Sequence, residues 1–168
     1  MNLSRSIVLI FAFCSILLSN TGQAQSFLLA NNFSFLSKVS SENTLRSNIT
    51  KYADNFVGTK YRSSGTTPAG FDCSGYVRFI FQQYGYDLAH SSRELATEGK
   101  AVSKIDAKPG DLVIFAYNGS VHHVAMVYSN NNGDIEIIHS CTSKGVTIER
   151  ISDSAYWTKR FYSIRRVI

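Results

Sequence analysis

Apolar residues follow a helical period directly after Asp72. They stand at Tyr76, Val77, Ile80, Phe81 and Tyr84. This spacing puts them on one face of an α-helix. The Asp72 carboxylate suits the position before a helix, where it can accept backbone N–H groups, and Gly85 suits the position after its end. We therefore predict a helix from Cys73 to Tyr84.

Two further stretches show a helical pattern. Ser41-Glu42-Asn43-Thr44 can start a helix that ends at Gly58. Its buried face would consist of Leu45, Ile49, Tyr52, Ala53 and Phe56. A shorter helix is expected after His90-Ser91-Ser92 and ends at Gly99. Between the two long helices, residues 58–70 are rich in Gly, Ser and Thr and predict a loop.

From Asp111 onward the apolar period becomes two, which indicates strands. The expected strands are residues 112–117, 121–128, 135–140, 146–150 and 161–168. Asn118-Gly119 is a strong signal for a tight hairpin between the first two. Helices followed by antiparallel strands predict an α+β domain, with N-terminal helices packed on a curled antiparallel sheet of about five strands.

The first residues have a different pattern. One basic residue, Arg5, precedes an apolar run over residues 6–18 and a small, polar stretch over 19–25. This order is typical of a secretory signal peptide, which we assign to residues 1–24. The run is shorter than the roughly 20 residues that span a bilayer, so a retained membrane helix is the weaker alternative. We expect a loosely structured leader over residues 25–42, the domain over 43–168, and export to the periplasm or beyond.

Composition narrows the classes of partner. A length of 168 residues with 44% hydrophobic residues suits one compact domain. Without residues 1–24 the chain has 16 Lys and Arg against 12 Asp and Glu, a net charge of +4. These charges are spread out, whereas a nucleic-acid-binding protein concentrates them, so we expect no nucleic-acid partner. A mildly basic surface suits a protein that works beside an anionic polymer such as a cell wall. It is equally consistent with a solvated surface that has no partner. We expect a monomer that meets the membrane only through its export signal.

Cys73 is the strongest candidate for chemistry. It stands in the first turn of the predicted helix, where the helix dipole favours a thiolate, so we expect a thiol that ionises more readily than usual. In an oxidising compartment Cys73 and Cys141 could instead form a disulfide. The residues leave both interpretations open.

A thiol nucleophile needs a base, and three histidines lie on predicted strands. Alternation puts His123 and His122 on opposite faces of the sheet, and the pattern does not decide which faces the helices. His139 shares a face with Ile135, Ile137 and Cys141. If that face meets the helices, His139 and Cys141 both lie near the catalytic layer.

A zinc site is the other use for these side chains. Cys73, His123, His139 and Cys141 are a Cys2His2 set. No two of them show the short spacing of structural zinc sites, so we predict no metal.

Taken together, the chain resembles the NlpC/P60 family of cell-wall cysteine peptidases, which have a papain-like core. The resemblance runs from about Asn43 to the C-terminus. It rests on the order of five motifs: Gly58-Thr59-Lys60-Tyr61-Arg62, Asp72-Cys73-Ser74-Gly75-Tyr76-Val77, Pro109-Gly110-Asp111-Leu112-Val113-Ile114-Phe115, His123-Val124-Ala125-Met126-Val127-Tyr128 and Ile138-His139-Ser140. Within the family the chain is most similar to the small, single-domain murein endopeptidases of Gram-negative envelopes.

The resemblance implies a role for each site residue. Cys73 would attack a peptide carbonyl, His123 would act as its base, and His139 would hold the His123 ring. The Cys73 N–H and the Tyr61 hydroxyl would stabilise the oxyanion. Asp72 and Ser74 match positions that face the substrate. No metal or organic cofactor is implied.

We therefore expect an exported endopeptidase that hydrolyses peptide bonds in peptidoglycan stem peptides or cross-links. One alternative is an amidase or acyltransferase on the same fold. Another is a non-catalytic wall-binding domain with a Cys73–Cys141 disulfide. The sequence does not distinguish D,L from D,D bonds.

Overall fold

The computed structural model describes residues 31–168. The expected signal peptide, and the leader up to residue 30, lie outside the described residues. The chain divides into two compact units, Met1–Thr44 and Leu45–Ile168, and each is considered by itself.

The described part of the first unit, residues 31–44, is helical and mostly exposed. Residues 31–42 were expected to be loosely structured, and the helix was expected to start at Ser41. That start is wrong, because helical backbone passes through the expected cap. The Ser41 hydroxyl donates to the Lys38 carbonyl oxygen at 3.2 Å, and the Thr44 hydroxyl donates to that of Ser40 at 2.9 Å. Ser and Thr make such bonds inside helices as well as at their starts, so composition alone misplaced the boundary.

The second unit opens with helical residues 45–54, which bury Ile49 and Ala53 as predicted. The chain then turns at Gly58, whose φ is +88°. Helix α2, Cys73–Gln82, is capped by Asp72 as predicted, but it ends two residues earlier than expected. A turn replaces its last residues, and in that turn the Gly85 N–H donates to the Gln82 carbonyl oxygen at 3.2 Å. Helix α3, Ser92–Leu95, is a single turn capped by Ser91.

The main sheet has six antiparallel strands in the order β3-β8-β4-β5-β6-β7. Five of them are the predicted strands: β4 Leu112–Tyr117, β5 Ser120–Asn131, β6 Asp134–Cys141, β7 Gly145–Arg150 and β8 Phe161–Arg166. The sixth, β3 Lys100–Val102, was not predicted because it is short and has no apolar alternation. The expected hairpin is confirmed, since Asn118 and Gly119 have φ of +48° and +76°.

Two smaller elements were also missed. The loop before α2 contains a short hairpin of β1, Thr66–Thr67, and β2, Gly70–Phe71. Helix α4, Ala155–Arg160, lies just before β8 and is capped by Ser154. Across residues 31–168 no helix has both the length and the apolar character that a bilayer crossing requires.

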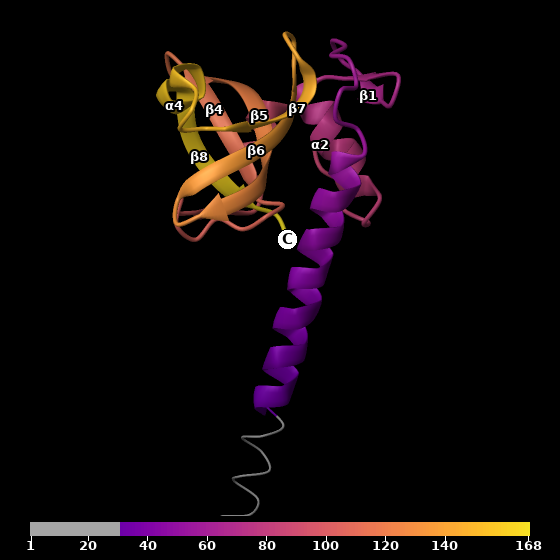
Figure 1. Ribbon diagram of the computed structural model, residues 1–168, viewed down its shortest axis with the longest axis vertical. Coiled ribbons are helices and arrows are strands. Elements are labelled where there is room, and N and C mark those ends of the chain that lie inside the picture. Colours follow the sequence, from indigo (N-terminus) through magenta and orange to yellow (C-terminus); the bar gives the residue numbers. More distant parts are fainter. Residues whose placement is uncertain (1–30) are drawn as a thin grey trace, which may run out of the picture. The chain divides into compact units, whose positions relative to one another are not determined.

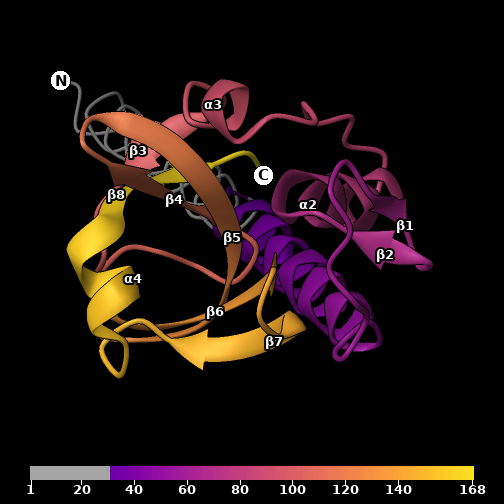
Figure 2. The ribbon, with the colours of Figure 1, turned by 90° about the horizontal axis from the view of Figure 1, so that it is seen from above.

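The sheet has a separate hydrophobic cluster on each face. Helix α2 lies beside one face of the curled sheet, and α4 lies on the other side (Figures 1 and 2). The helix-side cluster takes Leu112, Ile114, Val124, Met126 and Ile138 from the sheet. The inner cluster takes Val113, Phe115, Ala125, Val127, Ile135 and Ile137, together with Trp157 of α4. The alternation of β4, β5 and β6 therefore fills both clusters, which is why both faces of these strands looked apolar in the sequence.

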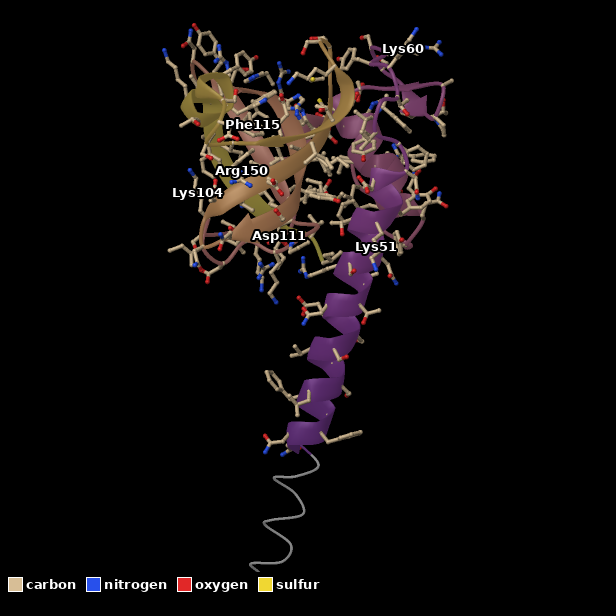
Figure 3. The ribbon with its side chains drawn as sticks, viewed as in Figure 1. Lys51, Lys60, Lys104, Asp111, Phe115 and Arg150 are labelled. Carbon is tan, nitrogen blue, oxygen red and sulfur yellow. The ribbon has the colours of Figure 1, made fainter. Side chains whose placement is uncertain are left out.

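A buried ionic cluster at one end of the sheet connects three segments of the second unit. Asp111 is completely buried and accepts from Arg46 at 3.0 Å and from Arg166 at 2.7 Å. These residues come from the first helix, the turn before β4 and the end of β8. Asp111 and Phe115 lie towards opposite ends of the sheet (Figure 3). The ionic cluster is therefore remote from the histidines, one of which contacts Phe115.

Candidate active site

The start of α2 is built by contacts between close neighbours in the sequence. The Asp72 Oδ1 accepts from the Gly75 N–H at 2.7 Å and from the Ser74 hydroxyl at 3.2 Å. The Asp72 N–H donates to the Gly65 carbonyl oxygen at 2.9 Å, which brings the preceding loop against the helix. A Cβ on Gly75 would lie 2.1 Å from that same oxygen, so only glycine fits there. Cys73 is thereby held in the first turn.

Cys73 is a free thiol, and burial raises its pKa above the ordinary value. The Asp72 carboxylate raises it further, while backbone N–H groups, chiefly that of Val124, act in the opposite direction. The expectation of an easily ionised thiol is therefore wrong, because the helix start does not outweigh the loss of solvent. The Cys73 thiol is neutral at rest.

His123 and His139 lie on the inner face of the sheet. His123 alternates with Ala125 and Val127, which belong to the inner cluster. His139 alternates with Ile135 and Ile137 of the same cluster, so this face meets α4 rather than α2. The condition under which His139 was expected near the helices is not met. Cys73 instead meets strand β5 through the backbone N–H of Val124.

A β-bulge separates His123 from its neighbour His122. Along the β4–β5 pairing, Phe115 faces His123 but Ala116 faces Val121, which leaves His122 without a partner in the ladder. Such a bulge redirects side chains. It allows the exposed His122 and the buried His123 to line one cavity.

The two histidines form a hydrogen-bonded chain that ends on a carboxylate. His123 Nε2 lies 2.9 Å from His139 Nδ1, and His139 Nε2 lies 3.0 Å from Glu149 Oε2. A carboxylate only accepts, so His139 carries its proton on Nε2 and accepts at Nδ1. His123 then carries its proton on Nε2, and its Nδ1 keeps a free lone pair. Glu149 thus sets the tautomer of both rings.

Both histidines are neutral at neutral pH. Burial, with His139 and His122 nearby, holds the pKa of His123 well below its ordinary value. Burial also lowers the pKa of His139, although Glu149 opposes that shift. Burial tends to raise the pKa of Glu149, but hydrogen bonds from Lys144, Trp157 and His139 hold it below the ordinary value. The site therefore has a charged carboxylate behind two neutral rings.

Trp157 of α4 fixes the positions of these groups. Its ring stacks on His123 with centroids 4.8 Å apart and meets His139 edge-on at 4.9 Å. Its indole N–H donates to Glu149 Oε2 at 2.9 Å. One side chain thus packs against both imidazoles and holds the carboxylate that orients them.

A cavity of about 200 Å³ opens beside Cys73. Its lining consists of Tyr61, Cys73, His122, His123, Cys141, Thr142, Tyr156 and Trp157. Burial raises the pKa of the Tyr61 hydroxyl, and the nearby Cys73 and Asp72 add to the shift, so this hydroxyl keeps its proton. The cavity is where the structure brings together three predicted residues, Cys73, His123 and Tyr61.

The other predicted residues lie outside this lining. His139 lies behind His123, while Asp72 and Ser74 form part of the helix start, as its cap and in its first turn. Asp72 also receives His90, whose Nε2 is 3.0 Å from Asp72 Oδ2. Cys73 and Cys141 are both free, so the disulfide of the structural alternative is not formed.

Three residues of this region were not found by reasoning from the sequence: Glu149, Trp157 and His90. Glu149 stands in a predicted strand, and Trp157 is the one tryptophan of the chain. No neighbouring residue in the sequence indicates the role of either one. Glu149 contacts His139 from another strand, and Trp157 contacts it from α4. His90 was interpreted only as part of the helix start His90-Ser91-Ser92, so its contact with Asp72 was not predicted.

Comparison with known proteins identifies the family of the domain. The sequence profile of the NlpC/P60 family matches residues 58–166. Murein DD-endopeptidase MepS/Murein LD-carboxypeptidase of Escherichia coli K12 is 39% identical over 119 residues, which are 70% of this chain and 60% of the relative. The probable endopeptidase NlpC homolog of Haemophilus influenzae is 36% identical over 114 residues, or 67% and 58% of the two chains. The chain thus spans about 60% of the length of these relatives.

Solved structures agree with the fold. An NlpC/P60 family protein from Bacillus cereus superposes with a TM-score of 0.66 and 31% identity, covering 73% of this chain and 40% of that one. The NlpC/p60 domain of the peptidoglycan hydrolase SagA gives a TM-score of 0.60 and 27% identity, covering 72% and 97%.

Proposed function

The chain belongs to the NlpC/P60 family, and from this premise we propose that it is a cysteine endopeptidase that hydrolyses peptide bonds in peptidoglycan. The names of its relatives support the substrate class, since they include a murein endopeptidase and a peptidoglycan hydrolase. The observation that carries the proposal is the single cavity that Cys73, His123 and Tyr61 line together.

In the proposed mechanism, Cys73 attacks the carbonyl carbon of the peptide bond, and His123 Nδ1 takes the thiol proton. Because the thiol and the ring are both neutral at rest, the proton moves as the substrate reacts, which is general-base catalysis. His123 then gives the proton to the leaving amine. A water molecule, activated by the same ring, releases the acyl group from sulfur.

His139 is proposed as a positioning residue. Its hydrogen bond to His123 Nε2, at 2.9 Å, keeps the lone pair of that ring on Nδ1. As His123 gains its second proton, Glu149 at the end of the chain stabilises the resulting positive charge.

The Cys73 N–H and the Tyr61 hydroxyl are proposed as the oxyanion donors. Two observations support Tyr61: it lines the cavity beside Cys73, and its raised pKa keeps the hydroxyl proton available for donation. Direct substrate contact by Asp72 or Ser74 stays a prediction. Their observed contacts support a role in building the helix start instead.

We place this activity in the cell envelope, with the protein exported as a monomer to the periplasm or beyond. The support is chemical, since peptidoglycan lies outside the cytoplasmic membrane and relatives are named for acting on murein. The proposed export signal is the apolar segment within residues 1–24.

The test is digestion of purified peptidoglycan, with the released fragments identified by mass spectrometry. We expect muropeptides cut within the stem peptide or cross-link, and a loss of at least about 100-fold for Cys73→Ala and His123→Ala. His122→Ala is the matched control, because it removes the neighbouring imidazole of the same cavity and should cost much less. Equal fragment release by Cys73→Ala and the wild type would refute the nucleophile. Cleavage between glycan and peptide would indicate an amidase instead.

A further inference from the structure

Cys141 is the one thiol in the described residues that the proposed mechanism does not use. It is buried at the end of β6, two residues beyond His139, and lies close to Glu149 of β7. We propose that His139, Cys141 and Glu149 form a binding site for a thiophilic divalent cation such as Zn²⁺, and that occupation of this site switches off the His123 base.

The geometry suits a small cation. One ligand atom from each of the three side chains lies within 4.8 Å of the other two. Zinc bonds of about 2.0 to 2.3 Å bring tetrahedral ligands to within roughly 3.3 to 3.8 Å of each other, so small side-chain shifts are sufficient. Thiolate, imidazole and carboxylate together favour Zn²⁺ over Mg²⁺ or Ca²⁺, which prefer oxygen ligands.

An ion can reach two of these ligands, Cys141 and Glu149, through an open cavity. A cavity of about 300 Å³ is lined by Cys141, Glu149 and Trp157 among others, and it shares Cys141 and Trp157 with the cavity at Cys73. It has room for a water molecule as the fourth ligand. The Cys141 sulfur lies 3.6 Å from the Ser143 hydroxyl, a weak contact that a metal bond easily replaces.

The effect on the base follows from proton positions. In the metal-free chain, His139 carries its proton on Nε2, where it bonds to Glu149. That nitrogen must lose its proton to bind a metal, so the neutral ring carries the proton on Nδ1 instead. Nδ1 then donates to His123 Nε2, 2.9 Å away, and His123 carries its own proton on Nδ1. The nitrogen that should accept the thiol proton is thereby occupied.

The protons balance across this change. His139 releases its Nε2 proton to solvent and gains the proton that His123 held on Nε2, while His123 takes one proton from solvent at Nδ1. Cys141 releases its thiol proton on binding the metal. The net result is one proton released per ion bound. The site itself is independent of the proposed function, whereas the inhibition rests on it.

Binding is tested without activity, using Co²⁺ as a spectroscopic probe for Zn²⁺. The full chain carrying Cys14→Ser and Cys73→Ser keeps Cys141 as its one thiol. We expect Co²⁺ to give a thiolate-to-metal charge-transfer band that stoichiometric Zn²⁺ abolishes. Adding Glu149→Gln should weaken Co²⁺ binding at least tenfold, and Glu136→Gln, on neighbouring β6, is the matched control. Absence of the band in the folded protein, or equal binding by the Glu149→Gln protein, would overturn the site.

Inhibition is tested by titrating Zn²⁺ into the peptidoglycan digestion, with each protein compared with its own zinc-free rate. Wild type should be inhibited reversibly, with recovery on adding EDTA, and Cys141→Ser should require at least tenfold more Zn²⁺. Nitrogen-15 NMR should show the His123 proton move from Nε2 to Nδ1. Equal zinc sensitivity of the two proteins would overturn the switch. A charge-transfer band in a chain that never cleaves peptidoglycan would leave the metal site standing and refute the proposed function.

Discussion

The two sides of the candidate site are built in different ways. The side that holds Cys73 comes from a short stretch, in which Asp72, Gly75 and Gly65 are joined by backbone and cap hydrogen bonds. The side that holds His123 draws on β5, β6, β7 and α4, and its chain of contacts runs from His123 to Trp157. Placement of the thiol therefore depends on local shape, and readiness of the base depends on distant partners.

This difference also separates how each side can fail. On the thiol side, a larger side chain at the contact between the loop and the helix start would cause a steric clash. On the histidine side, the wrong tautomer would disable the base. Each ring has two nitrogens, and only one arrangement of protons leaves His123 Nδ1 free. The first failure should appear in stability, and the second in rate.

The largest expected effect is on the histidine side. Glu149→Ala removes the acceptor that fixes both tautomers, so kcat should fall about 100-fold, or about 2.7 kcal/mol. Glu149→Gln keeps an oxygen that can accept from His139 Nε2, so it should lose about tenfold or less. Steady-state kinetics on a defined muropeptide measures both. Equal losses for the two variants would show that the carboxylate acts only through its charge.

The next effect is on the thiol side. Gly75→Ala places a Cβ 2.1 Å from the Gly65 carbonyl oxygen and should lower the free energy of unfolding by about 2 kcal/mol. In an unobstructed helix the same change stabilises by up to about 1 kcal/mol, so the sign is diagnostic. Urea unfolding provides the measurement, with Gln82→Ala on the exposed part of α2 as control. A stabilised Gly75→Ala protein would mean that the loop does not press on the helix.

A third prediction concerns pH. Burial lowers the pKa of His123 and His139 in the folded chain. As pH drops below about 6.5, these histidines therefore become protonated in the unfolded chain before they do in the folded chain. Stability should therefore fall with decreasing pH, by up to about 1.4 kcal/mol per pH unit for each histidine. Unfolding midpoints at pH 7 and pH 5.5 should differ less for His123→Gln than for wild type. A Gln82→Ala control, which changes an exposed residue of α2, should keep the wild-type difference, and the same dependence in all three proteins would contradict the prediction.

The smallest effect tests whether the thiol side is wholly local. His90 reaches Asp72 from outside the stretch, at 3.0 Å. His90→Ala should cost about 1 kcal/mol of stability, because Asp72 keeps its bond to the Gly75 N–H. Chemical denaturation measures this cost, and kcat should stay within a few fold. Loss of activity without loss of stability would mean that His90 acts on the substrate, which would break the distinction between the two sides.

The same distinction explains what the sequence could predict. The cap at Asp72, the start of α2 and five strands follow from local patterns, and they are confirmed. The pKa of Cys73 was predicted in the wrong direction, because burial is a tertiary property that a helix position does not reveal. Glu149 and Trp157 could not be found, since nothing near either residue indicates that it packs against His139.

Strand alternation had a similar limit. It correctly separates the two faces of β6 and of residues 123–127 of β5, but it cannot say which cluster each face joins when both are apolar. His123 was chosen over His122 by family resemblance. The bulge that leaves His122 unpaired has no signal in the local pattern.

Hydrogen bonds join the two sides directly, in addition to the contact of Cys73 with the Val124 N–H. The Ser140 hydroxyl, next to His139, donates to the Phe71 carbonyl oxygen at 2.8 Å, and Phe71 precedes the cap residue Asp72. On β7, Val146 exchanges backbone hydrogen bonds with Gly58 and Thr59, each at 2.8 Å. Separating α2 and the loop before it from the sheet would break these bonds and leave polar groups unpaired. These bonds oppose a hinge motion between α2 and the sheet, so we expect a cleft of nearly constant width that selects among peptides by their shape at entry.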